Sequence, residues 1–222
     1  MNARPLFVLV GNDLALHGWS LAAAHAGAVA MLAAGAWLAP ARPEGALVSL
    51  VFNLNVLGTL VWADWLVSRE KTKGTVAWLR TLPIPDHALV GAKFCTHALC
   101  CVSCWLATSL PFAYGHFFPG RAGTWFVLML ALVTFGGVSV ATRWRFPQKL
   151  GHVLPPLVVL ALVMPVMVAQ RAGVDVEAGF APFWGHWSGR AVVAAVLATL
   201  YGSLVWATIW WVARSDTPRL VE

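Results

Sequence analysis

Long apolar runs constrain this chain more than any other feature. Of its 222 residues, 59% are hydrophobic and only 11% are charged, whereas about 25% of the residues of a soluble domain are charged. The polar residues are too few to cover a water-facing surface, so lipid must be the solvent for most of the chain. The sequence therefore predicts an all-α, polytopic membrane protein.

Six of the apolar runs are long enough to cross a hydrocarbon core of about 30 Å as helices. Prolines and glycines stand between the runs, where turns are needed. The expected spans are 20–39, 46–67, 89–114, 123–142, 150–169 and 190–213. Because the connections are short, we expect one transmembrane domain over 1–222.

The segment 4–19 differs from the expected spans because its polarity is mixed. Leucine and valine recur in it at helical spacing, with Asn12, Asp13 and His17 among them. This pattern predicts an amphipathic helix that lies at the membrane interface and leads into the first span. An extension of the first span is the alternative, and both interpretations stay open.

The basic residues indicate the orientation. With both termini in the cytoplasm, eleven Lys and Arg residues fall on the inner side and four on the outer side. Cytoplasmic loops of membrane proteins are enriched in these residues, so we expect both termini inside. The basic residues are not gathered on one polar face, and nucleic acid is therefore not an expected partner.

The cysteines lie together in one apolar stretch, at Cys95, Cys100, Cys101 and Cys104. The last two form a CxxC pair, but no second pair follows at the spacing of a zinc site. We interpret them as small side chains that pack between helices. No metal site is expected.

The longest cytoplasmic connection, 64–93, joins the second and third expected spans. Charged residues come first, and then apolar residues recur every three positions beside Trp78 until Pro83. This pattern predicts a short amphipathic helix that ends at the proline. Such a helix could dock a soluble partner or lie on lipid headgroups.

The run SREKTKGTVAWLRTLPIPDHALVGAK resembles the segment that follows the second span in permease subunits of type-2 ABC exporters. That family pattern has an acidic–basic pair, Gly-Thr, a leucine, a proline-containing turn and Gly-x-Lys. The matching residues here are Glu70, Lys71, Gly74, Thr75, Leu79, Pro83, Gly91 and Lys93. Family members often have Leu-Glu after Gly-Thr, where this chain has Val76 and Ala77.

The resemblance implies a single permease domain that acts as half of an exporter in the bacterial cytoplasmic (inner) membrane. The sequence has no G-x-x-x-x-G-K-[ST] phosphate loop, so we expect no enzymatic activity and no cofactor in this chain. ATP and Mg would be bound by a separate ABC ATPase. Further expected partners are membrane lipid and a second copy or paralogue of the chain. The expected ATPase-docking residues are Glu70, Lys71, Gly74, Thr75, Trp78, Leu79 and Leu82.

Polar side chains within or near the spans are candidates for lining a transport pathway. They are Asn53, Asn55, Asp64 and His97. The two asparagines point about 200° apart on a helix, so at most one faces a pathway. For Asp64, the preferred interpretation is an ion pair with Lys93 or a position at the interface.

Other functions stay open. The Leu-Pro-x-Pro turn at 82–85 is also similar to the haem-export subunit of the cytochrome c maturation system, so haem is an alternative substrate. A non-transporting scaffold or assembly factor could dock through the same short helix. A membrane-embedded enzyme would need acidic residues that converge, and those of this chain are scattered.

Overall fold

The computed structural model describes residues 4–38, 43–68, 70, 73–114, 122–146, 150–151, 153–155, 157, 164, 168, 172–173 and 186–215. All regular structure within these residues is helical. The long helices are α1 Arg4–Leu38, α2 Pro43–Ala63, α5 Asp86–Tyr114, α6 Ala122–Arg145 and α9 Trp187–Val212. The chain is thus all-α where it is described, as predicted.

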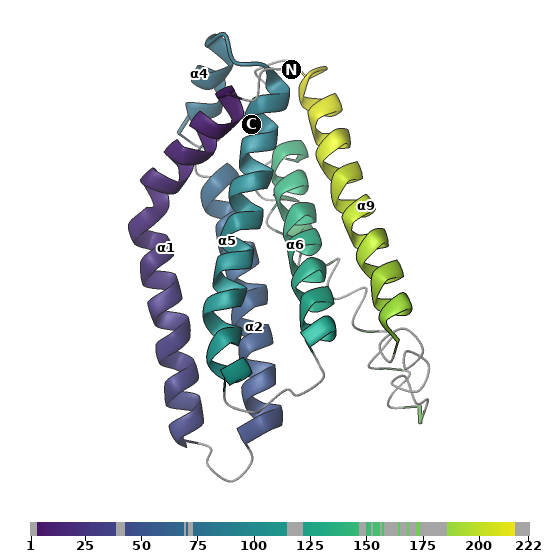
Figure 1. Cartoon of the computed structure of the whole chain (residues 1–222). Coiled ribbons are helices and arrows are strands. Elements are labelled where there is room, and N and C mark those ends of the chain that lie inside the picture. Colours follow the sequence, from purple (N-terminus) through teal and green to yellow (C-terminus); the bar gives the residue numbers. More distant parts are fainter. Residues whose placement is uncertain are drawn as a thin grey trace.

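The long helices form one bundle (Figure 1). In this view α1 and α9 lie at its two edges, with α5 and α6 between them and α2 behind. The helix α2 packs against both α5 and α6. α5 and α6 bury much of their apolar surface inside the bundle, whereas α1 and α9 bury little of theirs.

Four stretches of the described helices are long and apolar enough to cross a membrane: Arg4–Met31, Asp86–Thr108, Phe126–Arg145 and Trp187–Val212. They correspond to the first, third, fourth and sixth expected spans. The six-span count itself is not confirmed. The helix α2, where the second span is expected, is not among the four, and the expected span 150–169 lies mainly outside the described residues.

The N-terminal segment does not form a separate helix. Residues 4–19 and the expected first span are parts of one continuous helix, α1, and its membrane-length stretch begins at Arg4. The structure therefore favours the alternative, an extension of the first span. The physical reason is that Asp13, the charge that suggested an interface, is buried against another helix.

The connection between α2 and α5 contains the predicted short helix, α4 Thr75–Thr81. A π-helical turn, η1 Asp64–Ser68, precedes it. The helix α4 starts after Gly74, whose φ of 69° lies in the left-handed region that glycine adopts easily. It ends at Leu82, whose backbone is extended, as the following proline requires.

A cluster of buried apolar side chains holds this end of the bundle together. It consists of Ala63, Leu66, Val67, Leu89, Val90, Phe94, Val140, Trp144 and Val212. These residues come from the end of α2, from η1, from the start of α5 and from the ends of α6 and α9. Leu79 of α4 and the following Ile84 pack against the cluster, which fixes α4 on the bundle.

Candidate functional site

The helix α4 lies at the end of the bundle where α1 begins and α9 ends (Figure 1). Its side chains divide into an inward and an outward set. Leu79 packs on the apolar cluster, whereas Trp78 is 59% exposed. A large exposed aromatic side chain on a short helix that is anchored from behind is a typical anchor for a protein contact.

Arg80 connects α4 to two long helices. Its guanidinium lies 3.3 Å from the Asp86 carboxylate at the start of α5. It also donates hydrogen bonds to the Ser215 carbonyl at 3.1 Å and the Val212 carbonyl at 3.3 Å, at the end of α9. A cation at the C-terminus of a helix is favourable, because it satisfies carbonyls that have no partner within the helix. Movement of α4 is therefore tied to α5 and α9.

A groove of 380 Å³ separates α4 from the start of α1. Its lining is mostly apolar, with polar groups contributed by Arg4 and Asn12 of α1. Leu82, one of the expected docking residues, faces this groove together with Leu79. The two leucines thus help to pack α4 against the bundle, and they also form part of the surface of α4.

Lys93 of α5 joins α1 to the segment that precedes α4. Its ammonium nitrogen lies 2.6 Å from Asp13 Oδ1 and 2.6 Å from Glu70 Oε1. The Thr96 hydroxyl donates a hydrogen bond to Asp13 Oδ2 over 3.3 Å. We call these four residues the Lys93 cluster. Three segments far apart in the sequence meet in it.

The Lys93 cluster is removed from water. The exposed fractions of the side chains are 3% for Lys93, 7% for Asp13 and 14% for Glu70. Burying charges is costly unless they are paired and hydrogen-bonded. Burial raises the pKa of the Glu70 carboxyl above its ordinary value; the Lys93 ammonium opposes this rise and the Asp13 carboxylate adds to it.

Asp64 does not form an ion pair with Lys93, which was one of the two arrangements expected from the sequence. The other arrangement, a position at the membrane interface, stays a prediction. Asp64 Oδ1 instead lies 3.7 Å from Arg143 Nε of α6. Lys93 is already held by Asp13 and Glu70. The reason is that η1 also packs against α6, which brings Asp64 to Arg143.

The pathway candidates separate into buried and exposed positions. Asn55 is buried and donates a hydrogen bond to the Thr108 hydroxyl at 2.9 Å, whereas Asn53 is exposed. His97 is fully buried, and its Nε2 donates to the Thr59 carbonyl at 3.0 Å. Asn55 and His97 therefore join α2 to α5.

Close packing surrounds the His97 ring. A Cβ added at Gly136 of α6 would lie 1.9 Å from His97 Cε1, so only glycine leaves room for the imidazole. The Cys101 sulfur lies 3.6 Å from both ring nitrogens. This histidine is a packed core residue that links α2, α5 and α6.

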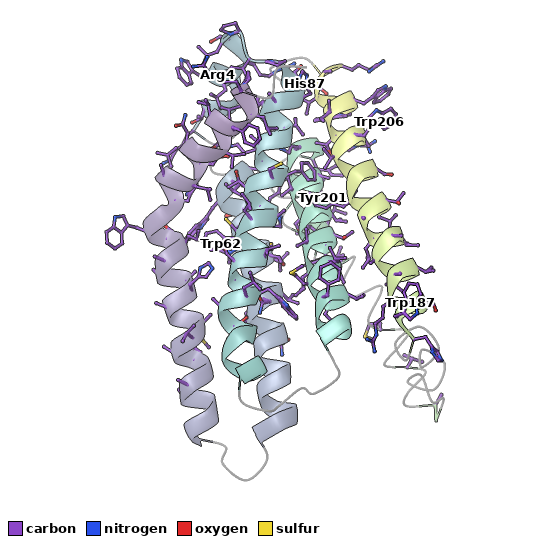
Figure 2. All side chains as sticks on the ribbon, in the orientation of Figure 1. Arg4, Trp62, His87, Trp187, Tyr201 and Trp206 are labelled. Atoms are coloured by element: carbon purple, nitrogen blue, oxygen red, sulfur yellow. The ribbon has the colours of Figure 1, made fainter. Side chains whose placement is uncertain are left out.

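The outer helix α9 has side chains that contact the bundle and others that point away from it. Tyr201 reaches from α9 to α5, where its hydroxyl donates to the Phe94 carbonyl at 2.8 Å. Trp206 is directed away from the bundle, and Trp187 stands at the end opposite to α4 (Figure 2). Both tryptophans are exposed, as expected for side chains that face lipid or the headgroup region.

The expected docking residues occupy different environments. Glu70 is engaged with Lys93, Gly74 provides the turn before α4, and Thr75 begins the helix. Trp78 is exposed. Lys71 lies outside the described residues. The structure therefore brings most of this set to one end of the bundle and leaves Trp78 as its prominent outward side chain.

Sequence reasoning missed three residues of this region. No partner was predicted for Asp13, and Arg80 and Arg143 were counted only among the basic residues that indicate the orientation. A usable signal existed for Asp13, because a carboxylate within a membrane-length apolar stretch needs a partner. For Arg80, two of the three partners are backbone carbonyls at and just after the end of α9, which no sequence pattern marks.

The comparisons with known proteins address the family. A family model described as ABC-2 family transporter protein matches residues 21–169, which is well over half of the chain. No curated protein and no solved structure matched the chain. The resemblance to permease subunits of type-2 ABC exporters is thus confirmed at the level of the family. The chain belongs to the ABC-2 family of transporter proteins, multi-pass membrane subunits of ABC transporters that are distinct from the ATPase.

Proposed function

We propose that this chain is the membrane-spanning subunit of an ABC exporter, that it forms the substrate pathway and that a separate ATPase drives it. Family membership supports a membrane transport subunit with an ABC ATPase as its general partner. The observation that carries the proposal for this chain is α4: a short helix with an exposed tryptophan, fixed to the long helices from behind.

The ATPase would contact α4 through Trp78 and the neighbouring exposed surface. A movement of the ATPase would be passed on to α5 and α9 through the contacts of Arg80 and through the packing of Leu79 on the apolar cluster. A rigid connection of this kind can transmit movement of a bound partner into a change between two helix arrangements. The proposal places this end of the bundle in the cytoplasm of a bacterial inner membrane, with both termini on that side.

The pathway would require a second copy of the chain or a paralogue. Support comes from the outer helices, since α1 and α9 present exposed apolar side chains such as Leu16 and Val196. Asn53, Asn55, Asp64 and His97 stay candidates for contact with substrate. Of these, His97 is the least accessible, because its ring is enclosed and hydrogen-bonded. It therefore gives no support to haem ligation.

Co-purification with an ATPase tests the docking proposal. We expect Trp78→Ala to reduce recovery of the ATPase and its stimulated turnover, because truncation of an exposed aromatic anchor typically costs about 2 kcal/mol or more of binding energy. Trp187→Ala is the matched control: this tryptophan is also exposed, at 81%, but stands at the opposite end of the bundle. Equal recovery with both variants would refute docking through α4.

Leu79→Asp is a less selective variant, because Leu79 also packs on the apolar cluster. A thermal unfolding curve of the isolated subunit separates the two effects. Loss of ATPase recovery without loss of thermal stability is the result expected for Trp78→Ala. A comparable loss of stability would assign Trp78 to folding and would contradict the proposal.

A further inference from the structure

The charges of the Lys93 cluster do not balance. Two carboxylates, Asp13 and Glu70, share the single ammonium of Lys93. Because each carboxylate oxygen lies 2.6 Å from the same nitrogen, the two oxygens are at most about 5 Å apart. With all groups ionised the cluster would hold one excess negative charge in a site with little water. Two carboxylates that share one buried site favour the uptake of a proton.

The hydrogen bonds indicate which carboxylate takes the proton. Both oxygens of Asp13 accept hydrogen bonds, one from Lys93 and one from the Thr96 hydroxyl. Glu70 accepts through Oε1, while its Oε2 is buried and has no hydrogen-bond partner among the residues that the structure describes. Hydrogen bonds donated to a carboxylate stabilise its ionised form, so Asp13 is better held as an anion than Glu70.

We propose that Glu70 is a proton-binding site: its Oε2 takes up a proton from the cytoplasmic solution, which leaves one carboxylate against one ammonium. The proton enters from water, since Glu70 is the most exposed of the three charged side chains. Among the residues that the structure describes, the charged groups that act on Glu70 are Lys93 from α5 and Asp13 from α1. Burial raises the pKa of Glu70 in the same direction.

The consequence for transport rests on the proposed function. Glu70 precedes α4 in the chain, so its charge sets how strongly the segment that bears α4 is held to Lys93. Protonation of Glu70 ends its ion pair with Lys93. The ammonium then donates to a neutral carboxyl oxygen, and the attraction between opposite charges is lost. The hold of this segment on α5 is therefore weaker when Glu70 carries the proton.

Infrared titration of the purified full chain in lipid nanodiscs tests the proton site without any ATPase. The probe is the carbonyl stretching band of a protonated carboxyl group. We expect a band that titrates at higher pH than a free glutamate and that is absent from Glu70→Gln. Asp86→Asn is the control, since Asp86 pairs with Arg80 outside the cluster, and it should leave the band and its midpoint unchanged.

A second variant keeps the test decisive if Glu70→Gln does not fold. Asp13→Asn removes the excess negative charge and should lower the midpoint of the Glu70 titration by about one pH unit, the size of shift that a charge within about 4–6 Å causes. An unchanged band in Glu70→Gln, or an unshifted midpoint in Asp13→Asn, would overturn the proposal. Either result would leave ATPase docking through Trp78 intact, so the two proposals fail separately.

Discussion

Arg80 and Val212 join elements that are 132 residues apart in the chain: an Arg80 guanidinium nitrogen donates a hydrogen bond to the Val212 carbonyl over 3.3 Å. The contact closes the end of α9 with a side chain of α4. It links the short helix α4 directly to the end of the long helix α9, so the two helices are held together.

Removal of this contact should uncouple α4 from α9. We expect Arg80→Ala to lower the free energy of unfolding by about 1–2 kcal/mol, because several hydrogen bonds from a charged, partly exposed group are lost. If an ATPase docks on α4, its binding should persist while its stimulation by the membrane subunit falls. Thermal unfolding and ATPase turnover in nanodiscs measure the two effects.

The control for Arg80 is Arg214→Ala. Arg214 stands at the same end of α9, but its guanidinium lies over the Trp210 ring, 4.2 Å from the ring centre, and is exposed. Stability and turnover close to those of the wild type are expected. A similar loss of turnover in both variants would assign the effect to positive charge at this end rather than to the link with α4.

Lys93 should be among the most sensitive positions for stability. The change Lys93→Met leaves two buried carboxylates without their cation, and breaking a buried ion pair in this way costs about 3–5 kcal/mol. Lys73→Met, at an exposed position, should change stability little. In detergent, we expect Lys93→Met to unfold at a much lower temperature than Lys73→Met.

The same cluster offers a rescue experiment. Combining Lys93→Met with Asp13→Asn and Glu70→Gln removes all three charges, and apolar or neutral replacement of a buried ionic group is often neutral or stabilising. We expect the triple variant to recover most of the stability lost in the single one. Additive losses would show that the residues do not act as one charged group.

Gly136 should tolerate no larger residue. Gly136→Ala forces a methyl group into the His97 ring, and overpacking of this kind costs about 1–3 kcal/mol. Gly27→Ala is a matched change in α1, where a Cβ meets nothing within 4 Å, and it should change stability by less than about 1 kcal/mol. Equal unfolding temperatures for the two variants would contradict the packing described here.

Stability should depend on pH through Glu70. Its pKa in the folded chain is raised above the ordinary value of 4.5, so the folded state binds the proton more tightly than the unfolded chain does. The resulting stabilisation is complete below the unfolded pKa and is lost as the pH rises through the folded pKa. Unfolding temperatures measured across this interval should fall with rising pH in the wild type.

Glu70→Gln should remove this slope, because the amide does not titrate. The difference in unfolding temperature between wild type and variant should therefore change with pH between the ordinary glutamate value and the raised one. A constant difference over that interval would show that Glu70 does not titrate there.

The sequence predicted several elements well because their signals are local. Apolar length and the turn residues that flank it place α5, α6 and α9 within a few residues of the expected spans. The short helix α4 was predicted from its three-residue apolar spacing and from Pro83. The lengths and ends of these helices depend on residues that are close in the chain, so they can be predicted from the sequence alone.

The failures have a common physical cause, which is pairing across the bundle. Asp13 was one of the polar residues that left two interpretations open for 4–19, an interfacial helix or an extension of the first span, and Lys93, 80 residues away, pairs with it inside the bundle. Asp64 was expected to pair with Lys93 or to lie at the interface, and the structure pairs it with Arg143. Sequence separation does not determine which charges meet, and only the packing of the helices does.

The position of the buried apolar cluster has a consequence for the shape of any movement. It unites α2, α5, α6 and α9 at the end that carries α4. Further along, α9 is held again, because the Leu197 carbonyl accepts a hydrogen bond from Thr134 of α6 and the Tyr201 hydroxyl donates one to the Phe94 carbonyl of α5. A tilt imposed beside α4 would therefore turn α9 together with α6, as one rigid pair.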